Sequence, residues 1–324
     1  MVKMNIIEAI HNALELQMRE NPDVIILGED IGRNGGVFGT TRGLIDEFGD
    51  VRVLDTPLSE SGIVGFAVGI AVAGLKPIAE IQFIDFIWPA ADQIFSELAK
   101  FRYRSGGMFP TPVVVRSPYG GGVKGAHYHS QSPEAYFAHT PGITILVPSN
   151  PYDAKGMLIA AIRSEDPVLF MEPKRIYRAF KEDIPEEAYE VPIGKANVVK
   201  EGSDITIVSY GAMLHVALDA AEEAEKEGIS CEVIDLRSIV PLDIETIGDS
   251  VRKTGRFISV TEAPKTAGFS AELSALVAER WIEYMESPIL RVTGYDTPFP
   301  FVLEHEYMPS TSRVLHTIRK SYNY

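Results

Sequence analysis

Short apolar runs alternate with helical patterns along the first part of the chain. Each run is rich in valine, isoleucine and leucine and is followed by polar or turn residues, which is typical of a buried strand. The predicted strands span residues 24–28, 76–81, 112–116, 143–147 and 167–171. Helical spacing falls between them at residues 90–103 and 153–163, and Asn5 is placed to cap an earlier helix. The alternation predicts an α/β fold.

The pattern is interrupted once and then resumes. From residue 172 to about residue 200, prolines and charged residues dominate without a sustained period, which predicts a linker. Beyond the linker, strands are predicted at residues 204–210, 231–236 and 256–261, and helices at residues 214–227 and 271–284. A chain of 324 residues suits two domains better than one core. We therefore expect one domain over residues 1–185 and a second over residues 195–324.

Composition excludes several classes of protein. The formal net charge of −15 argues against a nucleic-acid partner, which requires clustered cations. The single cysteine, Cys231, excludes an internal disulfide framework and suits a reducing compartment, and its place in a predicted strand favours a buried apolar role. No apolar run is long enough to span a bilayer. We expect a cytoplasmic protein that binds neither nucleic acid nor membrane.

The residues richest in potential chemistry follow a glycine-rich loop. Residues 126–137 contain His127 and His129 together with hydroxyl, amide and carboxylate side chains. Residues 120–125 match G-x-G-x-x-G, but Pro118 intervenes and no helix opens at the third glycine, so we interpret them as a mobile loop that covers a substrate. The sequence offers neither a convincing set of metal ligands nor a nucleophile elbow. The functional role that we consider for the histidines is therefore proton transfer or hydrogen bonding to a ligand. The alternative is that they are buried structural residues.

A second candidate is Glu60, which precedes a glycine-rich helical segment. A glutamate at the start of a helix is most often a contact with the helix dipole. Small residues recur here at spacings of three and four, on one helical face: Gly62, Gly65, Gly69 and Ala73. Glycine lowers helix stability, so its repeated use predicts the close approach of another surface, which we interpret as a subunit interface. A carboxylate at the rim of that interface is well placed for chemistry shared between subunits.

Several stretches together resemble one family. They are residues 56–60 (TPLSE), 81–86 (IQFIDF), 127–137 (HYHSQSPEAYF), 231–241 (CEVIDLRSIVP) and 294–300 (GYDTPFP). Nearly end to end, the chain resembles the beta subunit of the thiamin-diphosphate-dependent 2-oxo acid dehydrogenase first component. Residues 129–135 (HSQSPEA) are more similar to the branched-chain or broad-specificity members than to strict pyruvate enzymes. The resemblance implies an N-terminal pyrimidine-binding-type parallel sheet with helices on both faces, followed by a C-terminal transketolase-type α/β domain.

The resemblance also implies partners. In this family two alpha and two beta chains form a heterotetramer with thiamin diphosphate at each alpha–beta interface, and the C-terminal domain contacts the second beta subunit and docks the dihydrolipoyl acyltransferase core. The alpha chain holds the diphosphate and Mg²⁺ through a G-D-G…N-N motif. This chain lacks that motif, because Gly49-Asp50 is followed by Val51 and Gly248-Asp249 by Ser250. We expect it to bind only the aminopyrimidine half of the cofactor and to be inactive alone.

Five residues match family positions at the cofactor and substrate. Glu60 matches the glutamate that hydrogen-bonds pyrimidine N1′ and favours the tautomer whose 4′-nitrogen removes the thiazolium C2 proton, after which the cofactor serves as the electron sink. Leu58, Gln82 and Phe86 match positions around the pyrimidine; relatives often carry tyrosine at the place of Phe86, so stacking is kept and a hydroxyl contact is lost. His129 matches the histidine that hydrogen-bonds substrate or intermediate and assists acyl transfer to the lipoyl group.

Some relatives hold a monovalent cation through backbone carbonyls. The matching positions here are Thr111, Val113, Val114, Ala161, Ser164 and Asp166. Ser164 and Asp166 replace an aspartate and an asparagine of relatives, a change that main-chain ligands tolerate. The resemblance thus implies a K⁺ site in this part of the chain.

The implied function is oxidative decarboxylation of a small 2-oxo acid with transfer of the acyl group to lipoyl. We expect a 3-methyl-2-oxobutanoate dehydrogenase first and a pyruvate dehydrogenase next. The alternative is a structural or docking subunit whose polar cluster only shapes an interface. A self-sufficient transketolase-like enzyme is a third hypothesis, against which the missing diphosphate motif argues.

Overall fold

The chain is divided into two compact units. The structure, a computed structural model, describes residues 1–324. The first unit comprises Met1–Tyr119 and Tyr136–Ile193, and the second comprises Gly120–Ala135 and Gly194–Tyr324. The main division between them, after Ile193, lies in the predicted linker, and the domain bounds 1–185 and 195–324 stay a prediction.

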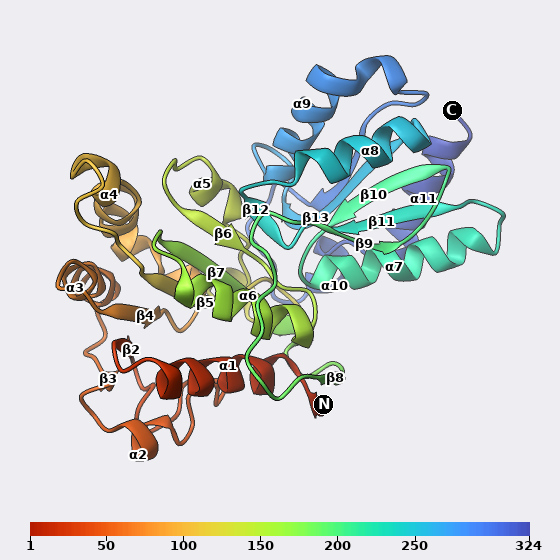
Figure 1. Cartoon of the computed structure of the whole chain (residues 1–324). Coiled ribbons are helices and arrows are strands. Elements are labelled where there is room, and N and C mark those ends of the chain that lie inside the picture. Colours follow the sequence, from red (N-terminus) through yellow and green to blue (C-terminus); the bar gives the residue numbers. More distant parts are fainter. The chain divides into compact units, whose positions relative to one another are not determined.

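The first unit is built on six parallel strands in the order β6-β7-β5-β4-β2-β3 (Figure 1). Their bounds are Val24–Gly28 (β2), Val53–Asp55 (β3), Lys76–Glu80 (β4), Val114–Tyr119 (β5), Thr144–Leu146 (β6) and Val168–Pro173 (β7). Every residue of β2, β5 and β7 is buried, as expected for a parallel sheet covered on both faces. The five strands predicted for this part of the chain are present, and β3 was not predicted. A short β1 (Val2–Met4) pairs with β8 (Glu182–Ile184) inside the predicted linker.

Helices cover the first sheet. They are α1 (Ile6–Glu20), α2 (Leu44–Phe48), α3 (Glu60–Val72), α4 (Phe101–Arg104), α5 (Glu134–Ala138), which begins in the second unit, and α6 (Pro151–Arg163). Asn5 caps α1 in a capping box with Glu8, which confirms the predicted cap. Helices α1 and α6 pack against each other, whereas α3 packs on β4.

The helix predicted over residues 90–103 is wrong as one continuous α-helix. A 3₁₀ turn at Trp88–Ala90 leads into a π-helical segment, Gln93–Glu97, another 3₁₀ turn, Leu98–Lys100, and then α4. The apolar spacing was correctly read as helical, but fourteen residues cannot distinguish 3.0, 3.6 and about 4.4 residues per turn. The π segment brings the Gln93 side chain against Gly65 of α3, where a Cβ would lie 3.1 Å from the Gln93 Oε1.

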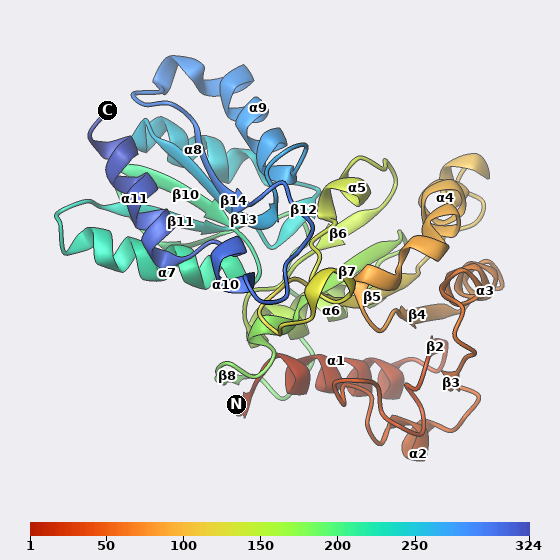
Figure 2. The same cartoon turned by 180° about the vertical axis from the view of Figure 1, so that it is seen from behind.

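The second unit has a five-stranded sheet in the order β14-β13-β10-β11-β9, with only β9 antiparallel. The strands are β9 (Asn197–Lys200), β10 (Ile205–Ser209), β11 (Cys231–Asp235), β13 (Phe257–Pro264) and β14 (Leu290–Gly294), and β12 (Ser238–Val240) is a further short strand. Figures 1 and 2 show α8 (Ile244–Thr254) and α9 (Phe269–Trp281) on one face of this sheet. On the other face, α7 (Ala212–Glu225) packs with α11 (Thr311–Tyr322), and a short α10 (Glu304–Tyr307) precedes α11.

The sequence predicted β10, β11, β13, α7 and α9, and missed β9, β14, α8 and α11. Cys231 is fully buried in β11, and burial raises the pKa of its thiol to about 12, so it is an apolar core residue as predicted. None of the helices combines the length and the apolar composition needed to cross a bilayer.

Candidate active site

The candidate site lies at the carboxyl edge of the first sheet. Strands β3, β2 and β4 are parallel neighbours, and Gly28 at the end of β2 is in register with Asp55 of β3 and Glu80 of β4. Residues 56–60 and 81–86 leave the sheet at this edge, beside Glu29. Open α/β sheets bind ligands outside the carboxyl ends of their strands, so this edge is a suitable place for a ligand.

Glu60 is the first residue of α3. The helix begins here because the Ser59 side chain caps it, accepting a hydrogen bond from the Gly62 amide at 3.4 Å. The Glu60 side chain is half-buried, and its carboxylate forms no hydrogen bond or ion pair within the chain. A carboxylate in this position is free to exchange a hydrogen bond with a bound molecule.

The other three predicted cofactor residues surround this edge. Gln82 is half-buried, and its Nε2 lies 3.5 Å from the Glu29 carbonyl, the outer limit of a hydrogen bond. Phe86 ends a short 3₁₀ turn, and its ring meets that of Phe83 edge-on, with centroids 5.8 Å apart. Leu58 is 71% exposed. A half-open set of one carboxylate, one amide and apolar side chains fits the aminopyrimidine half of thiamin diphosphate.

Glu29 is a residue that sequence reasoning missed as a member of the site. Burial first, and then the charges of Asp30 and Glu60, raise the pKa of Glu29 above its ordinary value. The carboxylates of Glu29 and Glu60 therefore interact at the same edge of the sheet. The available signal is a carboxylate directly after the strand predicted over residues 24–28.

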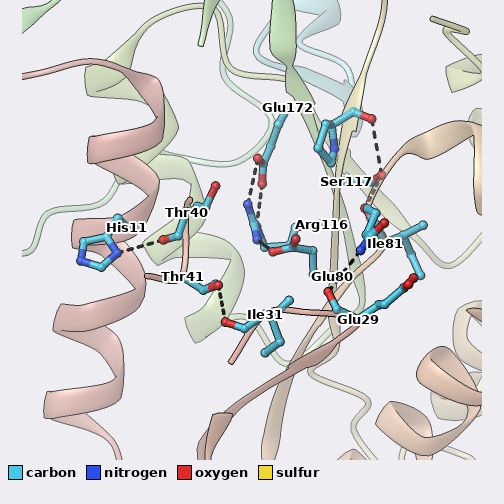
Figure 3. A network of polar contacts seen from close by, with 12 residues as sticks. His11, Glu29, Ile31, Thr40, Thr41, Glu80, Ile81, Arg116, Ser117 and Glu172 are labelled. Atoms are coloured by element: carbon cyan, nitrogen blue, oxygen red, sulfur yellow. Dashed lines mark hydrogen bonds and ion pairs between the residues drawn. The ribbon is translucent and has the colours of Figure 1, made fainter. Parts of the chain in front are cut away.

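The loop that follows Glu29 is fixed to the first sheet and to α1. The Thr41 hydroxyl donates to the Ile31 carbonyl at 2.6 Å, and the Gly32 amide donates to the Asp55 carboxylate at 2.6 Å. His11 on α1 donates from Nδ1 to the Thr40 carbonyl at 2.9 Å (Figure 3). These contacts hold the backbone on both sides of the loop and so hold Glu29 in place.

Beneath the site lies a buried charge cluster that the sequence did not reveal. Arg116 of β5 donates from Nε and Nη2 to the Glu172 carboxylate at 2.7 and 2.9 Å, and it also pairs with Glu80 (Figure 3). The Tyr177 hydroxyl donates to Glu172 Oε2 at 2.6 Å. Arg116, Glu80 and Glu172 are adjacent because β7, β5 and β4 are neighbouring strands. We name these four residues the buried charge cluster.

The cluster holds two carboxylates and one guanidinium, so its charges do not balance. Burial most strongly raises the pKa of Glu80, and the Glu172 charge raises it further while Arg116 opposes both. Burial alone would lower the pKa of Arg116, but the charges of Glu172 and Glu80 raise it above its ordinary value. Arg116 thus stays charged and pairs with both acids, while the pKa of Glu80 stays above its ordinary value.

The histidine-bearing segment belongs to the second unit. His127 is exposed and His129 half-buried, in and just after a 3₁₀ turn at Ala126–Tyr128. Gly125 permits the chain to fold back on itself, because a Cβ there would lie 2.5 Å from the Cβ of His129. The segment carries no regular dinucleotide-type turn into a helix, which agrees with our rejection of that motif.

Glu134 ends this segment as a fully buried acid. The Tyr210 hydroxyl donates to its Oε1 at 2.6 Å, whereas its Oε2 has no hydrogen-bond partner. Burial is the main reason that the pKa of Glu134 rises to about 7; the Glu262 charge also raises it, and the Tyr210 hydrogen bond opposes the rise. Because the folded pKa is raised, Glu134 favours the folded state fully below pH 4.5, its ordinary pKa, and that contribution is lost as pH rises through about 7.

We therefore expect Glu134→Gln to gain stability relative to the unaltered chain as pH rises from 4.5 to 8. The glutamine amide cannot ionise. The variant therefore avoids the decrease of about 3 kcal/mol in the free energy of unfolding that follows from the raised pKa of Glu134. Urea unfolding followed through Trp281, one of two tryptophans and the one in the second unit, measures this difference. Glu222→Gln, an exposed carboxylate on α7, controls for the loss of one charge, and equal pH profiles for the two variants would contradict the prediction.

The implied cation positions lie in the first unit. The Thr111 carbonyl accepts from the Val113 amide at 2.7 Å, the Val113 carbonyl from Val168 at 2.9 Å, and the Ala161 carbonyl from Ser164 at 3.2 Å. Each carbonyl keeps a second lone pair for a ligand. The Asp166 carboxylate pairs with Arg102 at 2.7 Å. The chain has no group of three or more His, Cys, Asp or Glu side chains suited to hold a metal ion.

Comparisons with known proteins place this geometry in a family. Residues 2–179 match the transketolase pyrimidine-binding domain, and residues 194–314 match the transketolase C-terminal domain. The chain is 52% identical over 324 residues to the mitochondrial 2-oxoisovalerate dehydrogenase subunit beta of Dictyostelium discoideum, covering 99% of this chain and 87% of that protein. It is 50% identical over 321 residues to the pyruvate dehydrogenase E1 component subunit beta of Bacillus subtilis, covering 99% of both. The chain belongs to the family of 2-oxo acid dehydrogenase E1 beta subunits.

The fold of this E1 beta chain is shared with transketolases. A structure described as a split-gene transketolase, an inactive beta4 tetramer, superposes with a TM-score of 0.80 at 24% identity and covers 99% of both chains. The predicted family and the predicted two-part α/β fold are confirmed. E1 beta chains act in thiamin-diphosphate-dependent enzymes. A relative named for 2-oxoisovalerate and one named for pyruvate are almost equally similar to this chain, so sequence identity is shared between the branched-chain and pyruvate branches of the family.

Proposed function

We propose that this chain is the catalytic beta subunit of a dehydrogenase that oxidatively decarboxylates branched-chain 2-oxo acids, with pyruvate as the next substrate, and passes the acyl group to lipoyl. The observation that carries the proposal is the Glu60 carboxylate, which is half-buried at the carboxyl edge of the sheet without a partner in the chain. The identity to named dehydrogenase subunits supports the same reading.

Each residue has a separate role in this proposal. Glu60 exchanges a hydrogen bond with the pyrimidine ring nitrogen, while Leu58, Gln82 and Phe86 enclose the ring. His129 contacts the substrate and assists transfer of the acyl group. Thiamin diphosphate, when bound, supplies the electron sink for decarboxylation. Once the ring is bound, the apolar side chains of Leu58 and Phe86 would shield it from water and strengthen the contact that Glu60 makes.

The site is proposed to be completed by an alpha chain. Leu58 and Phe66 are 71% and 57% exposed, and around a Cβ built on Gly69 of α3 nothing lies within 4 Å. This apolar, glycine-lined surface, formed by α3 and the residues just before it, is suited to close packing with another chain. We assign Mg²⁺ and the diphosphate to that alpha chain. We further propose a heterotetramer of two alpha and two beta chains, an acyltransferase core as the docking partner, and the cytoplasm as the compartment, which the single free cysteine favours.

The K⁺ site is part of the proposal. The positions concerned are Thr111, Val113, Val114, Ala161, Ser164 and Asp166. A pocket of about 430 Å³ is lined by Thr111 and Asp166 among others, and the buried Thr111 hydroxyl has no hydrogen-bond partner. Hydroxyl and carbonyl oxygens are the ligands that such a cation prefers. A bound K⁺ would connect the segment that precedes β5 to the segment that follows α6.

The proposal predicts that a panel of 2-oxo acids is decarboxylated only when this chain is assembled with its alpha chain. The assay uses an artificial electron acceptor, thiamin diphosphate and Mg²⁺, with each chain alone as the control. Branched-chain substrates are expected to give the highest kcat/KM. Activity of this chain alone would show that it binds the diphosphate itself, and inactivity of the assembled complex would leave a docking subunit as its function.

A further inference from the structure

The carboxyl edge of the second sheet is occupied by the chain's own histidine segment. Strands β10 and β13 are parallel neighbours with Ser209 opposite Val260. Tyr210 directly follows β10, and Glu262 lies near the end of β13, so both side chains lie where an α/β sheet binds ligands. What they bind here is Gly120–Ala135, the segment that carries His129.

Three side chains of the second unit hold this segment by hydrogen bonds. Glu262 accepts from the Gly121 amide at 3.1 Å, and Glu304, the first residue of α10, accepts from the Lys124 amide at 3.0 Å. Tyr210 donates to Glu134 at the other end of the segment, at 2.6 Å. Two of the acceptors are carboxylates bonded to backbone amides, which are among the stronger hydrogen bonds of proteins.

The segment is held in a backbone conformation that it would not adopt unaided. Lys124 and Ala126 have φ angles of 55° and 54°, in the left-handed region that side chains with a Cβ disfavour. These two residues immediately flank Gly125 and precede the histidines. Backbone strain persists only where surrounding contacts impose it, and here the surrounding contacts come from Glu262, Glu304 and Tyr210.

We propose that Tyr210, Glu262 and Glu304 are positioning residues of the C-terminal unit that set the place of His129. They form a clasp that fixes the segment at both ends, and none of them needs to touch the substrate. The inference rests on the proposed role of His129 for its effect on turnover, but the clasp itself is a property of this chain alone. It makes the C-terminal unit part of the catalytic apparatus as well as a docking module.

The first test is backbone amide exchange of residues 120–135 in the full chain. Tyr210→Phe removes only the hydroxyl and leaves the buried Glu134 without its donor, so exchange in this segment is expected to accelerate about tenfold. Glu304→Ala removes a buried carboxylate and is expected to accelerate exchange of the Lys124 amide, with the fold of the variant checked by urea unfolding. Tyr284→Phe, a half-exposed tyrosine whose hydroxyl forms no hydrogen bond, is the matched control and is expected to leave the segment unchanged. Unchanged exchange in both clasp variants overturns the proposal.

The second test links the clasp to His129 in the assembled enzyme. Tyr210→Phe is expected to lower kcat for lipoyl acylation about tenfold, with KM for the 2-oxo acid changed less than about twofold. In a His129→Ala background the same substitution is expected to have no further effect, because a positioning residue acts through the group it positions. Full additivity of the two substitutions would overturn the proposal. If His129→Ala alone leaves turnover intact, the proposed role of His129 fails, and the exchange measurement still decides the clasp.

Discussion

Glu60→Gln is expected to lower turnover of the assembled enzyme by about 100- to 10,000-fold, the range of a lost acid–base group. Glutamine has nearly the same shape, but it cannot share a proton with a ring nitrogen as a carboxyl can. Glu60 forms no hydrogen bond or ion pair within the chain, and its charge only repels Glu29, so removing the charge breaks no attractive contact. Stability is therefore expected to change by less than about 1 kcal/mol. Acceptor-coupled turnover and urea unfolding, measured on the same preparation, separate the two effects.

The competing explanation is that Glu60 only interacts with the dipole of α3. Glu245→Gln is a matched control, because Glu245 is an exposed glutamate in the first turn of α8. Both substitutions alter a helix dipole contact by a few tenths to about 1 kcal/mol, and only Glu60→Gln is expected to affect turnover. Equal turnover of the Glu60 and Glu245 variants would remove Glu60 from the catalytic site.

Arg116→Met is expected to destabilise the first unit by about 3–5 kcal/mol. The substitution leaves Glu80 and Glu172 in the interior without their shared cation, at 5% and 0% exposure. Burial already raises the pKa of Glu80, and without the guanidinium that rise is larger, so the variant loses further stability as pH increases. The deficit is expected to be larger at pH 8 than at pH 5. Urea unfolding followed through Trp88, the tryptophan of the first unit, measures it.

Two further variants isolate the cause. Arg163→Met removes an arginine that also pairs with two acids, Glu20 and Glu190, but at the surface, where such pairs contribute about 0–1 kcal/mol. In the triple variant Glu80→Gln, Arg116→Met, Glu172→Gln the three charges of the cluster are gone together, and most of the lost stability is expected to return. A triple variant as unstable as Arg116→Met would mean that shape rather than charge is limiting.

The sequence predicted the strands of both sheets where apolar runs are long and uninterrupted. Val24–Gly28 is an example, since it is wholly apolar, fully buried and bounded by turns. Strands of three or four residues, such as β3 and β9, carry too little periodicity to be distinguished from loops. The segment around Gln93 was misjudged because its mixture of helix types depends on packing against α3.

The candidate site was predictable only in part, and through resemblance more than through residue chemistry. Glu60 and His129 stood out by their surroundings in the sequence. The buried charge cluster did not, because Glu80, Arg116 and Glu172 each interrupt a separate apolar strand. Their relation appears only when the strand order β7-β5-β4 places them side by side. Likewise, the partners of Glu134 are 76 residues away or more, at Tyr210 and Glu262.

The division of the chain also limits how it can be recombined. Gly120–Ala135 is inserted in the sequence of the first unit but belongs to the second. Consider a chimera of two relatives in which only the residues after 193 are exchanged. Its new C-terminal part would have to pack with residues 120–135 of the other relative, which evolved with a different C-terminal part. A functional exchange must carry residues 120–135 together with the C-terminal part. Substitutions that distinguish relatives in these two stretches are thus expected to have been inherited together.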